Sequence, residues 1–212
     1  MDQVTPSTPA VRGRRSPVDR YDERRDQLAE SALETLGKLG YARTSLREIA
    51  TNSEFSHGVL HYYFDDKLDL IIYCVRLYKA RCVTRYDAVI STSTTPEALI
   101  DAFAAKLVET ILEEGPMHRL WYDLRTQSMF EPRLREAVVA IDKTLADMVW
   151  RVVLRYAELT ERSPSMPAPS AYGLLDGLFQ QALLNHTLGE KEALPTLVEQ
   201  VHRLMPLTLG TR

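Results

Sequence analysis

Apolar residues recur three and four positions apart along most of the chain from residue 21 onward, and no segment shows a sustained alternation of apolar and polar residues. The first spacing collects apolar side chains on one face of an α-helix, whereas a half-buried strand requires a period of two. This pattern predicts an all-α fold of about nine helices.

The first helical stripe runs from Leu28 to Leu39 and stops at Gly40, a residue type that often terminates helices. Ser45 and Glu48 then form an S-x-x-E capping box, in which each side chain can bond the backbone N–H of the other residue. A second, short helix is therefore expected to begin after Ser45 and to end near residue 52.

Ser56 is expected to cap a third short helix, in which Leu60 and Phe64 lie one turn apart and face inward. Asp66 is expected to cap a fourth helix that runs to about residue 90. Residues 21–66 thus form a three-helix unit, followed by a larger helical unit at 67–212. Glycines and prolines in the larger unit, beginning with Gly115 and Pro116, delimit further helices near 96–114, 117–129, 132–160, 169–188 and 191–206.

Arginines gather at the beginning of the chain. Residues 1–20 include Arg12, Arg14 and Arg15 and carry few apolar residues, which predicts a disordered basic arm. The whole chain nevertheless has a net charge of −3, and the residues through 67 hold ten Lys/Arg against eleven Asp/Glu. Overall charge therefore does not by itself indicate a polyanionic partner.

Only two cysteines occur, Cys74 and Cys82, and no apolar leader precedes them. The longest apolar run, LIIYCV at 70–75, is far shorter than the roughly 20 residues that span a bilayer. We expect a reduced, cytoplasmic chain without a membrane anchor, in which both cysteines act as small core residues.

His57 and His61 stand four positions apart in the stretch SHGVLHYYF, which is the spacing of two zinc ligands on one helix. A zinc-protease helix reads H-E-x-x-H, but here Gly58 occupies the position of the general base. Glu199 and His202 form a single E-x-x-H, whereas di-iron bundles use two such motifs. The chain also lacks a nucleophile elbow, a phosphate-binding loop and a dinucleotide fingerprint, so no metal, no cofactor and no enzymatic activity are expected.

The same spacing suits a helix that reads DNA. Two short helices joined by a tight turn over residues 45–63 can place the second helix in the major groove. His57 and His61 would then reach base edges or phosphates, Tyr62 a phosphate oxygen, and Gly58 would permit close approach. The competing interpretation of each residue is an ordinary solvated position, or core packing for part of the aromatic run at 62–64.

The stretch SLREIATNSEFSHGVLHYYFDDKLDLI strongly resembles the DNA-binding signature of TetR-family transcriptional regulators, roughly T-x-x-x-I-A-x-x-A-G-V-S-x-G-x-L-Y-x-H-F-x-x-K-x-x-L. The upstream LGKLGYARTS is similar to the exit of the family's first helix. The resemblance implies an all-α homodimer with an N-terminal helix-turn-helix domain and a C-terminal domain for effector binding and dimerisation. Carried over by position, it implies DNA contacts from Ser45, Ser56, His57, Gly58, His61, Tyr62 and Lys67, and a minor-groove arm with Arg14 and Arg15.

The chain departs from the family pattern in the turn and in the helix that follows it. Ser53, Glu54 and Phe55 stand where A-G-V is usual, so Glu54 occupies a position that often exploits the freedom of glycine at positive φ. Strain or an altered turn is expected there. His61 stands where tyrosine is common, so the operator sequence is expected to differ.

In the C-terminal unit, LWYDLRTQSMFEPRLREA and AYGLLDGLFQQALL resemble helices of BetI-like members of the family. The resemblance implies a dimer interface made by the last two helices, with intramolecular packing as the alternative. The residues assigned to this interface are Gly173, Leu174, Gly177, Leu178 and Phe179. An effector pocket with apolar walls and a few polar tips is assigned to His118, Trp121, Tyr122, Phe103, Met129 and Trp150.

These features together predict a regulator, most simply a repressor that a small-molecule effector releases from palindromic operator DNA. The alternative is a helical dimer that binds a ligand or a protein and whose three-helix unit does not bind DNA. The near-neutral charge and Glu54 favour the alternative, whereas the specific signature at 45–70 favours the regulator.

Overall fold

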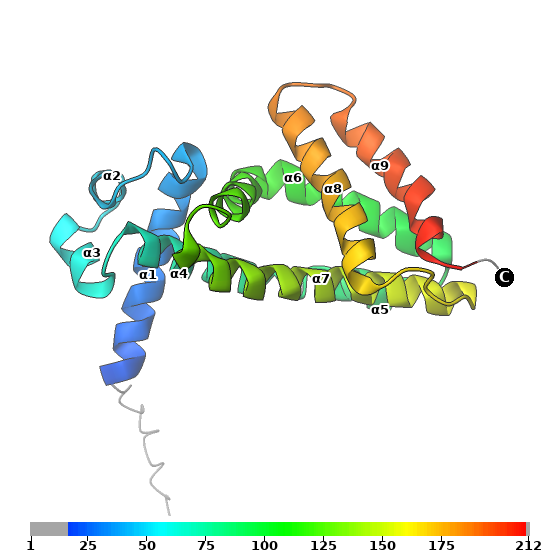
Figure 1. The fold of residues 1–212 in the computed structure, drawn as a ribbon, viewed down its shortest axis with the longest axis horizontal. Helices are drawn as coiled ribbons and strands as arrows, with labels where there is room; N and C mark the ends of the chain where they lie inside the picture. The colour runs from blue at the N-terminus through cyan, green and yellow to red at the C-terminus, as the bar shows by residue number, and fades with distance from the viewer. Residues whose placement is uncertain (1–16, 211–212) are drawn as a thin grey trace, which may run out of the picture.

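The computed structural model describes residues 17–210, and over this range it is built from helices (Figure 1). An isolated antiparallel bridge between Pro164 and Leu209 joins the loop before α8 to the end of the described chain. The prediction of an all-α fold is confirmed. The elements are α1 (Pro17–Leu39), α2 (Leu46–Thr51), α3 (His57–Tyr63), α4 (Lys67–Cys82), α5 (Asp87–Thr92), α6 (Pro96–Gln127), α7 (Pro132–Thr160), α8 (Ala168–Thr187), α9 (Ala193–Leu204) and the short 3-10 helix η1 (Met205–Thr208).

Three of the expected N-caps are present. The side chains of Ser45, Ser56 and Asp66 each accept a hydrogen bond from the backbone N–H three residues onward, at 3.1, 3.3 and 2.9 Å. Such caps satisfy N–H groups that have no partner inside the helix. They define the starts of α2, α3 and α4, which together with α1 make up the N-terminal part of the molecule.

The helix boundaries differ from the sequence prediction at two places. The helix expected from Asp66 to about residue 90 ends at Cys82, and α5 follows separately. The intervening turn carries Arg85, whose guanidinium points into the protein and binds Glu114 on α6 at 2.5 Å. This tertiary contact favours a turn where the local pattern would continue a helix.

Gly115 and Pro116 do not separate two helices, because α6 runs without a break from Pro96 to Gln127. A proline inside a helix removes one hydrogen bond and bends the helix rather than always ending it. Here the bend is packed on both sides: Gly37 of α1 lies against Pro116 and Met117, and Gly115 lies against Leu183 of α8. The two differences offset each other, so the described range still contains nine α-helices.

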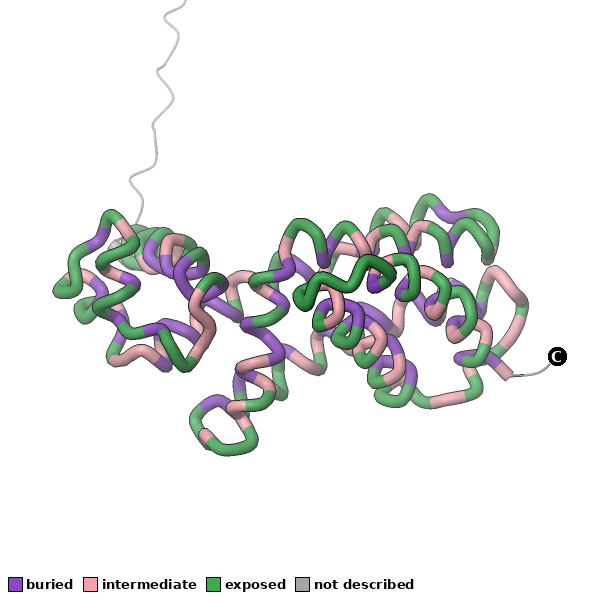
Figure 2. The backbone as a smooth tube through the Cα atoms, turned by 90° about the horizontal axis from the view of Figure 1, so that it is seen from above, coloured by how far each residue is buried: buried purple, intermediate pink, exposed green. Residues whose placement is uncertain are grey.

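The molecule has two lobes, and Figure 2 shows the smaller one as a distinct group of helices. We call this lobe, α1 to α3, the head. Leu28, Ile49, Leu60 and Phe64 are almost fully buried and form its core, and α4 then packs along α1 and continues into the larger lobe. Arg14 and Arg15, assigned to the basic arm, lie outside the described residues, and α1 begins at Pro17, within the segment predicted to be disordered.

In the larger lobe, α6 and α7 are the long helices, and α8 and α9 pack on each other and on α6. Figure 1 places α8 and α9 at the end of the molecule that is far from α2 and α3. Among the described residues, no helix combines the length and the apolar character needed to cross a membrane.

Candidate functional site

The turn between α2 and α3 is tight and is held by Ser53. Its hydroxyl accepts a hydrogen bond from the backbone N–H of Phe55 at 3.2 Å, and the Phe55 side chain is buried in the head. The expected strain at Glu54 is absent: in the described part of the chain the single non-glycine residue with positive φ is Glu161, at 54°. The turn therefore does not require glycine at Glu54, and the SEF sequence is accommodated without the left-handed conformation.

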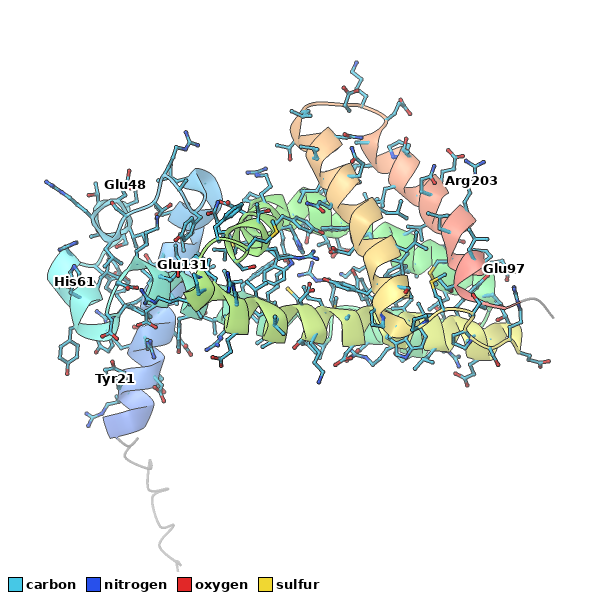
Figure 3. The ribbon with its side chains drawn as sticks, viewed as in Figure 1. Tyr21, Glu48, His61, Glu97, Glu131 and Arg203 are labelled. Atoms are coloured by element: carbon cyan, nitrogen blue, oxygen red, sulfur yellow. The ribbon has the colours of Figure 1, made fainter. Side chains whose placement is uncertain are left out.

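Helix α3 turns one face inward and one face to solvent. Leu60 is buried, whereas His57, Gly58, His61 and Tyr62 are exposed, Tyr62 to 73%. Figure 3 shows His61 at the outer end of the head, on the side away from α8 and α9. The predicted reading residues therefore share one accessible surface, which we call the α3 face.

Aromatic contacts order parts of this face. The rings of His57 and His61 lie edge to face with centroids 4.5 Å apart. Tyr21 of α1 contacts the rings of Tyr62 and Tyr63, with centroid distances of 6.4 and 4.8 Å. The Tyr21–Tyr62 pair is edge to face, whereas the Tyr21 and Tyr63 rings are tilted by 35°. No cluster of three or more His, Cys, Asp or Glu arranged to hold a metal occurs among the described residues.

Ser45 and Ser56 are exposed at the starts of α2 and α3, beside the α3 face. Lys67 has a different environment from the phosphate contact that the sequence predicts. Its Nζ donates a hydrogen bond to the backbone oxygen of Tyr41 at 2.6 Å and lies 4.3 Å from the centroid of the Tyr41 ring. Burial lowers the pKa of Lys67 from its usual range, with Glu48 and Asp123 acting in the opposite direction. In this structure Lys67 fixes the turn after α1.

Helix α4 connects the head with the interior of the larger lobe. Near its start, Asp69 pairs with Arg25 of α1 at 3.2 Å, and one turn later the Tyr73 hydroxyl donates to Asp26 at 2.5 Å. Helix α6 makes a second connection, since Asp123 accepts the backbone N–H of Tyr41 at 2.9 Å. Helix α4 is therefore bonded to α1, and α6 is bonded to the turn that follows α1.

A cavity of about 60 Å³ lies inside the larger lobe, between α4, α6, α7 and α8. Its walls are mostly aromatic and aliphatic side chains, which suits a small organic ligand. Three predicted effector residues, Phe103, His118 and Trp121, line it. The others on its walls are Lys79, Cys82, Arg85, Tyr86, Leu107, Thr110, Leu145, Met148, Val149, Tyr172, Leu175, Asp176 and Phe179.

Three further residues assigned to the effector pocket lie elsewhere. Met129 is 65% exposed in the turn after α6, and Trp150 packs on the core without lining the cavity. Tyr122 is buried beside the cavity, but it lines an open cleft between α6 and α8, and its hydroxyl donates to Asp176 at 2.9 Å. The helical pattern identifies apolar positions but does not reveal which of them border the same space.

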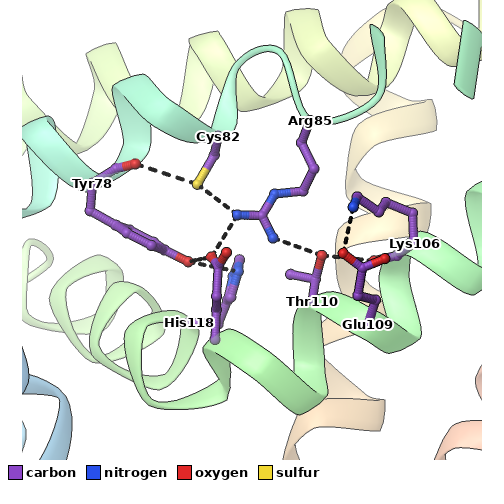
Figure 4. A network of polar contacts seen from close by, with 8 residues as sticks. Tyr78, Cys82, Arg85, Lys106, Glu109, Thr110 and His118 are labelled. Carbon is purple, nitrogen blue, oxygen red and sulfur yellow. Dashed lines mark hydrogen bonds and ion pairs between the residues drawn. The ribbon is translucent and has the colours of Figure 1, made fainter. Parts of the chain in front are cut away.

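A polar network crosses one side of the cavity (Figure 4). Arg85 donates to Thr110 at 2.7 Å and to Glu114 at 2.5 Å, and the Tyr78 hydroxyl donates to the same carboxylate. His118 Nε2 lies 3.2 Å from the Tyr78 hydroxyl. Contacts among these groups satisfy most of the polar atoms that the fold takes out of water.

Burial and the local charges set the ionisation of this network. Burial, together with the positive charges of Lys79 and Arg85, lowers the pKa of His118 well below its usual range, so the imidazole is neutral at pH 7. Burial raises the pKa of Glu114, but its bonds from Tyr78 and Arg85 outweigh that effect and leave the pKa lowered. The network therefore contains a carboxylate and a guanidinium that neutralise each other.

Sequence reasoning missed most of the polar residues of the cavity. A signal existed for Lys79, which follows Val75 by four positions and so places a charged residue on the buried stripe of α4. No comparable signal marks Arg85 or Glu114, because their pairing joins residues 29 positions apart.

The predicted dimer-interface residues do not all share one surface. Gly173 and Gly177 are exposed, with open space where a Cβ would stand, and Leu174 and Leu178 are half-buried. Phe179 is a correction: it is buried inside this chain, with its ring 4.9 Å from the ring of His118, and it lines the cavity. The outward stripe of α8 continues instead through the exposed Leu184 and Leu188.

Comparison with known proteins finds a family model that matches the head and a relative that matches most of the chain. Residues 28–74 match the model of the bacterial regulatory proteins, tetR family. The HTH-type transcriptional regulator BetI of Burkholderia mallei is 28% identical over 189 residues, covering 86% of this chain and 93% of that protein.

Two solved structures share the fold. The regulator FadR from Bacillus subtilis, in complex with stearoyl-CoA, superposes with a TM-score of 0.69 at 18% identity, covering 85% of this chain and 96% of that one. A transcriptional regulator from Saccharomonospora viridis in complex with choline gives a TM-score of 0.68 at 17% identity, covering 90% and 100%.

Proposed function

Because this chain is a member of the TetR family of transcriptional regulators, we propose that it is a repressor that a small effector releases from a palindromic operator. The observation that carries the proposal is the arrangement of two sites on connected helices. The α3 face is free at one end of the molecule, and the helix that follows it, α4, also forms a wall of the cavity.

In the proposed complex, α3 enters the major groove of DNA. His57 and His61 contact base edges or phosphates, and the Tyr62 hydroxyl donates to a phosphate oxygen. The hydroxyls of Ser45 and Ser56 are available to phosphates beside them. Arg14 and Arg15, which lie outside the described residues, would follow the minor groove, and Lys67 retains two N–H donors for a phosphate besides the one it gives to Tyr41.

Gly58 supports close approach to a partner. A Cβ at this position would meet nothing nearer than Ser56 Oγ at 4.0 Å, so packing within this chain does not require glycine. Glycine inside a helix nevertheless costs about 1 kcal/mol relative to alanine. Gly58 therefore lowers the stability of α3 although packing within the chain does not require it. Such a glycine is expected where the helix backbone must come close to DNA.

A palindromic operator requires two heads, and we propose that a second copy of this chain supplies the other. The outward stripe of α8, with Gly173, Gly177, Leu184 and Leu188, is the surface that would pack against α8 and α9 of the second copy. Glycines allow helices to approach closely, and the leucines supply apolar area. Effector binding would then change the spacing of two heads that must match grooves about 34 Å apart.

The first experiment selects operator DNA from random fragments with the full-length protein. We expect an enriched palindrome whose affinity falls steeply as salt concentration rises, because phosphate contacts release counterions. If no sequence is enriched, the proposal fails and the helical dimer without DNA binding is favoured.

The second experiment tests the α3 face with substitutions that leave the core intact. Tyr62→Ala should weaken operator binding roughly tenfold, and Tyr62→Phe should separate the hydroxyl from the ring contacts with Tyr21 and Tyr63. His61→Ala should also weaken operator binding, and Lys143→Ala, at an exposed position of α7, is the control for both substitutions. Equal operator affinity of all these variants would argue against the α3 face.

Gly58→Ala separates DNA contact from folding. It should raise the free energy of unfolding by about 0.5–1 kcal/mol while lowering operator affinity. Glu136→Ala, at an exposed position of α7 outside both proposed surfaces, is the control and should leave operator affinity unchanged.

The dimer is tested separately by sedimentation equilibrium. We expect a dimer for the native chain and a shift toward monomer for Leu184→Glu, because a carboxylate would be buried in the proposed interface. A native chain that sediments as a monomer at micromolar concentration would contradict this part of the proposal.

A further inference from the structure

The cavity in the larger lobe contains charged side chains, and nearly all of them are paired within the protein. Arg85 is bound by Glu114 and Thr110. Asp176 is bound by Arg125 at 2.5 Å and by the Tyr122 hydroxyl at 2.9 Å. These pairs present little unsatisfied charge to a ligand.

Lys79 is different. Its side chain is buried, with 3% exposure, and among the described residues it makes no hydrogen bond and no ion pair. Its Nζ lies 5.3 Å from the centroid of the Trp121 ring and 5.2 Å from that of Tyr78. Contacts with ring faces offset only part of the cost of removing an ammonium from water.

Trp121 also lines the cavity and carries a second donor without a partner in the described part of the chain. Its side chain is almost fully buried, and its indole Nε1 has no hydrogen-bond partner. Buried donors are satisfied in most proteins, by protein atoms or by something bound. Lys79 and Trp121 therefore leave two donors, one of them charged, and no matching acceptor.

We propose that the ligand of this cavity is a small organic carboxylate, which accepts hydrogen bonds from Lys79 and Trp121 and places a short apolar body against the walls formed by Phe103, Met148 and Phe179. The proposal rests on the effector role proposed above for this cavity. It adds the chemical class of the effector.

The same geometry disfavours the two ligand types bound by the structural relatives. A quaternary ammonium such as choline binds on aromatic faces, but here the ammonium of Lys79 already lies near the rings of Trp121 and Tyr78 and would repel it. A long acyl chain needs more room. The cavity of about 60 Å³ is less than half the roughly 150 Å³ that holds benzene in an engineered protein cavity, which favours a short-chain ligand.

The surface offers a route by which an anion could reach Lys79. Besides the cavity, Lys79 also lines an apolar groove on the outside of the molecule between α4 and α7. Arg76, one turn earlier on α4, is exposed at this groove and has no ion pair among the described residues. Positive charge at the surface followed by positive charge inside favours entry of an anion.

The ionisation of Lys79 agrees with this role. Burial, with a smaller contribution from Arg85, lowers its pKa to about 8, so most of the side chain is still charged at pH 7. A bound carboxylate would raise that pKa, and binding would take up a proton. Helix α7 contributes only apolar side chains to the cavity. The titratable and charged groups around Lys79 come from the other three helices and the turn after α4: Tyr78, Cys82 and Arg85 from α4 and that turn, Glu114 and His118 from α6, and Tyr172 and Asp176 from α8.

The test measures binding of acetate, propionate and butyrate to the full-length protein by calorimetry, without DNA. Propionamide and choline serve as neutral and cationic comparisons. We expect at least one carboxylate to bind at least tenfold more tightly than propionamide and choline, with uptake of about half a proton at pH 8. If none of the carboxylates binds, or if propionamide or choline binds equally well, the proposal is overturned.

Two variants identify the donors. Lys79→Met keeps the volume of the side chain and removes a buried charge, which cores commonly tolerate, and it should weaken carboxylate binding at least tenfold and abolish proton uptake. Trp121→Phe should weaken it roughly fivefold by removing one donor. Lys143→Met, at an exposed lysine of α7, is the control and should bind like the native chain. Unchanged binding by Lys79→Met contradicts the proposal.

Adding operator DNA distinguishes this proposal from the proposed function. If a carboxylate binds through Lys79 but leaves the protein on its operator, the anion site stands and the effector role fails. If a neutral or cationic compound releases the operator, the regulator proposal stands and the carboxylate proposal fails.

Discussion

On the α3 face, His57, His61 and Tyr62 are exposed and make ring contacts with neighbouring side chains of the head. Around the cavity, Arg85 and Glu114 are partly or largely removed from water, and each has two or more polar partners. The exposed side chains of the α3 face can therefore be changed at little cost to folding, whereas side chains at the cavity contribute to folding and, in the proposed function, also to ligand binding.

The largest expected effect is on stability at the cavity. Asp176→Ala removes the carboxylate that binds Arg125 at 2.5 Å and the Tyr122 hydroxyl at 2.9 Å, and leaves only the longer contacts, of Arg125 with Asp142 at 3.6 Å and of the Tyr122 hydroxyl with the backbone oxygen of residue 176 at 3.5 Å. Removing one partner of a largely buried pair typically costs about 3 kcal/mol of unfolding free energy. Urea denaturation checks this, and Tyr62→Ala in the head should leave the unfolding free energy within about 0.5 kcal/mol of the native value. An equal loss of unfolding free energy in Asp176→Ala and Tyr62→Ala would contradict the distinction between the cavity and the α3 face.

Lys79 should give a pH-dependent effect of nearly the same size. Its pKa is about 8 in the folded chain and has its usual value of 10.5 when unfolded, so between these values the unfolded chain binds more protons. The unfolding free energy of the native chain should therefore rise with pH across this window, relative to Lys79→Met, by on the order of 3 kcal/mol. Parallel pH profiles of the two proteins would contradict this ionisation.

A smaller effect is expected at the start of α3. Ser56→Ala removes the acceptor for the Val59 N–H and should lower the unfolding free energy by about 1 kcal/mol. Ser56→Thr, which can still cap the helix, should recover most of the loss. The comparison shows how much of any change in operator binding by Ser56→Ala comes from a disturbed α3 rather than from a lost DNA contact.

The smallest effect concerns the turn between α2 and α3. Because Glu54 does not have a positive φ, Glu54→Gly should slightly lower the unfolding free energy, by about 0.5 kcal/mol, through the greater freedom of glycine in the unfolded chain. A gain in stability would indicate the left-handed conformation that the family pattern suggests. Thermal unfolding of the two proteins side by side is sufficient.

The helix starts and the exposed face of α3 could be predicted from the sequence, because local capping residues and apolar spacing determine both. Ser45, Ser56 and Asp66 are local capping signals, so the starts of α2, α3 and α4 could be predicted from a few neighbouring residues. The exposed residues of α3 could also be predicted, because Leu60 and Phe64 define the buried face and the remaining positions must point to solvent.

The cavity could be predicted only in part. Phe103, His118 and Trp121 of the predicted effector residues line it, whereas Met129 and Trp150 do not. Phe179, which was predicted for the dimer interface, also lines it, because helical spacing does not show which neighbour a side chain meets. The turn at Arg85 and the unbroken α6 depend on contacts with distant helices. Such contacts override the local signals of glycine, proline and apolar spacing.

The position of α3 has a consequence for engineering. Its exposed residues contact one another and Tyr21 of the head, and the cavity is lined from α4 onward. An α3 with a different outward face, built on the same Leu60 and Phe64 anchors, would therefore leave the cavity walls unchanged. If the proposed function holds, the DNA sequence that is bound could therefore be changed independently of the ligand that is bound.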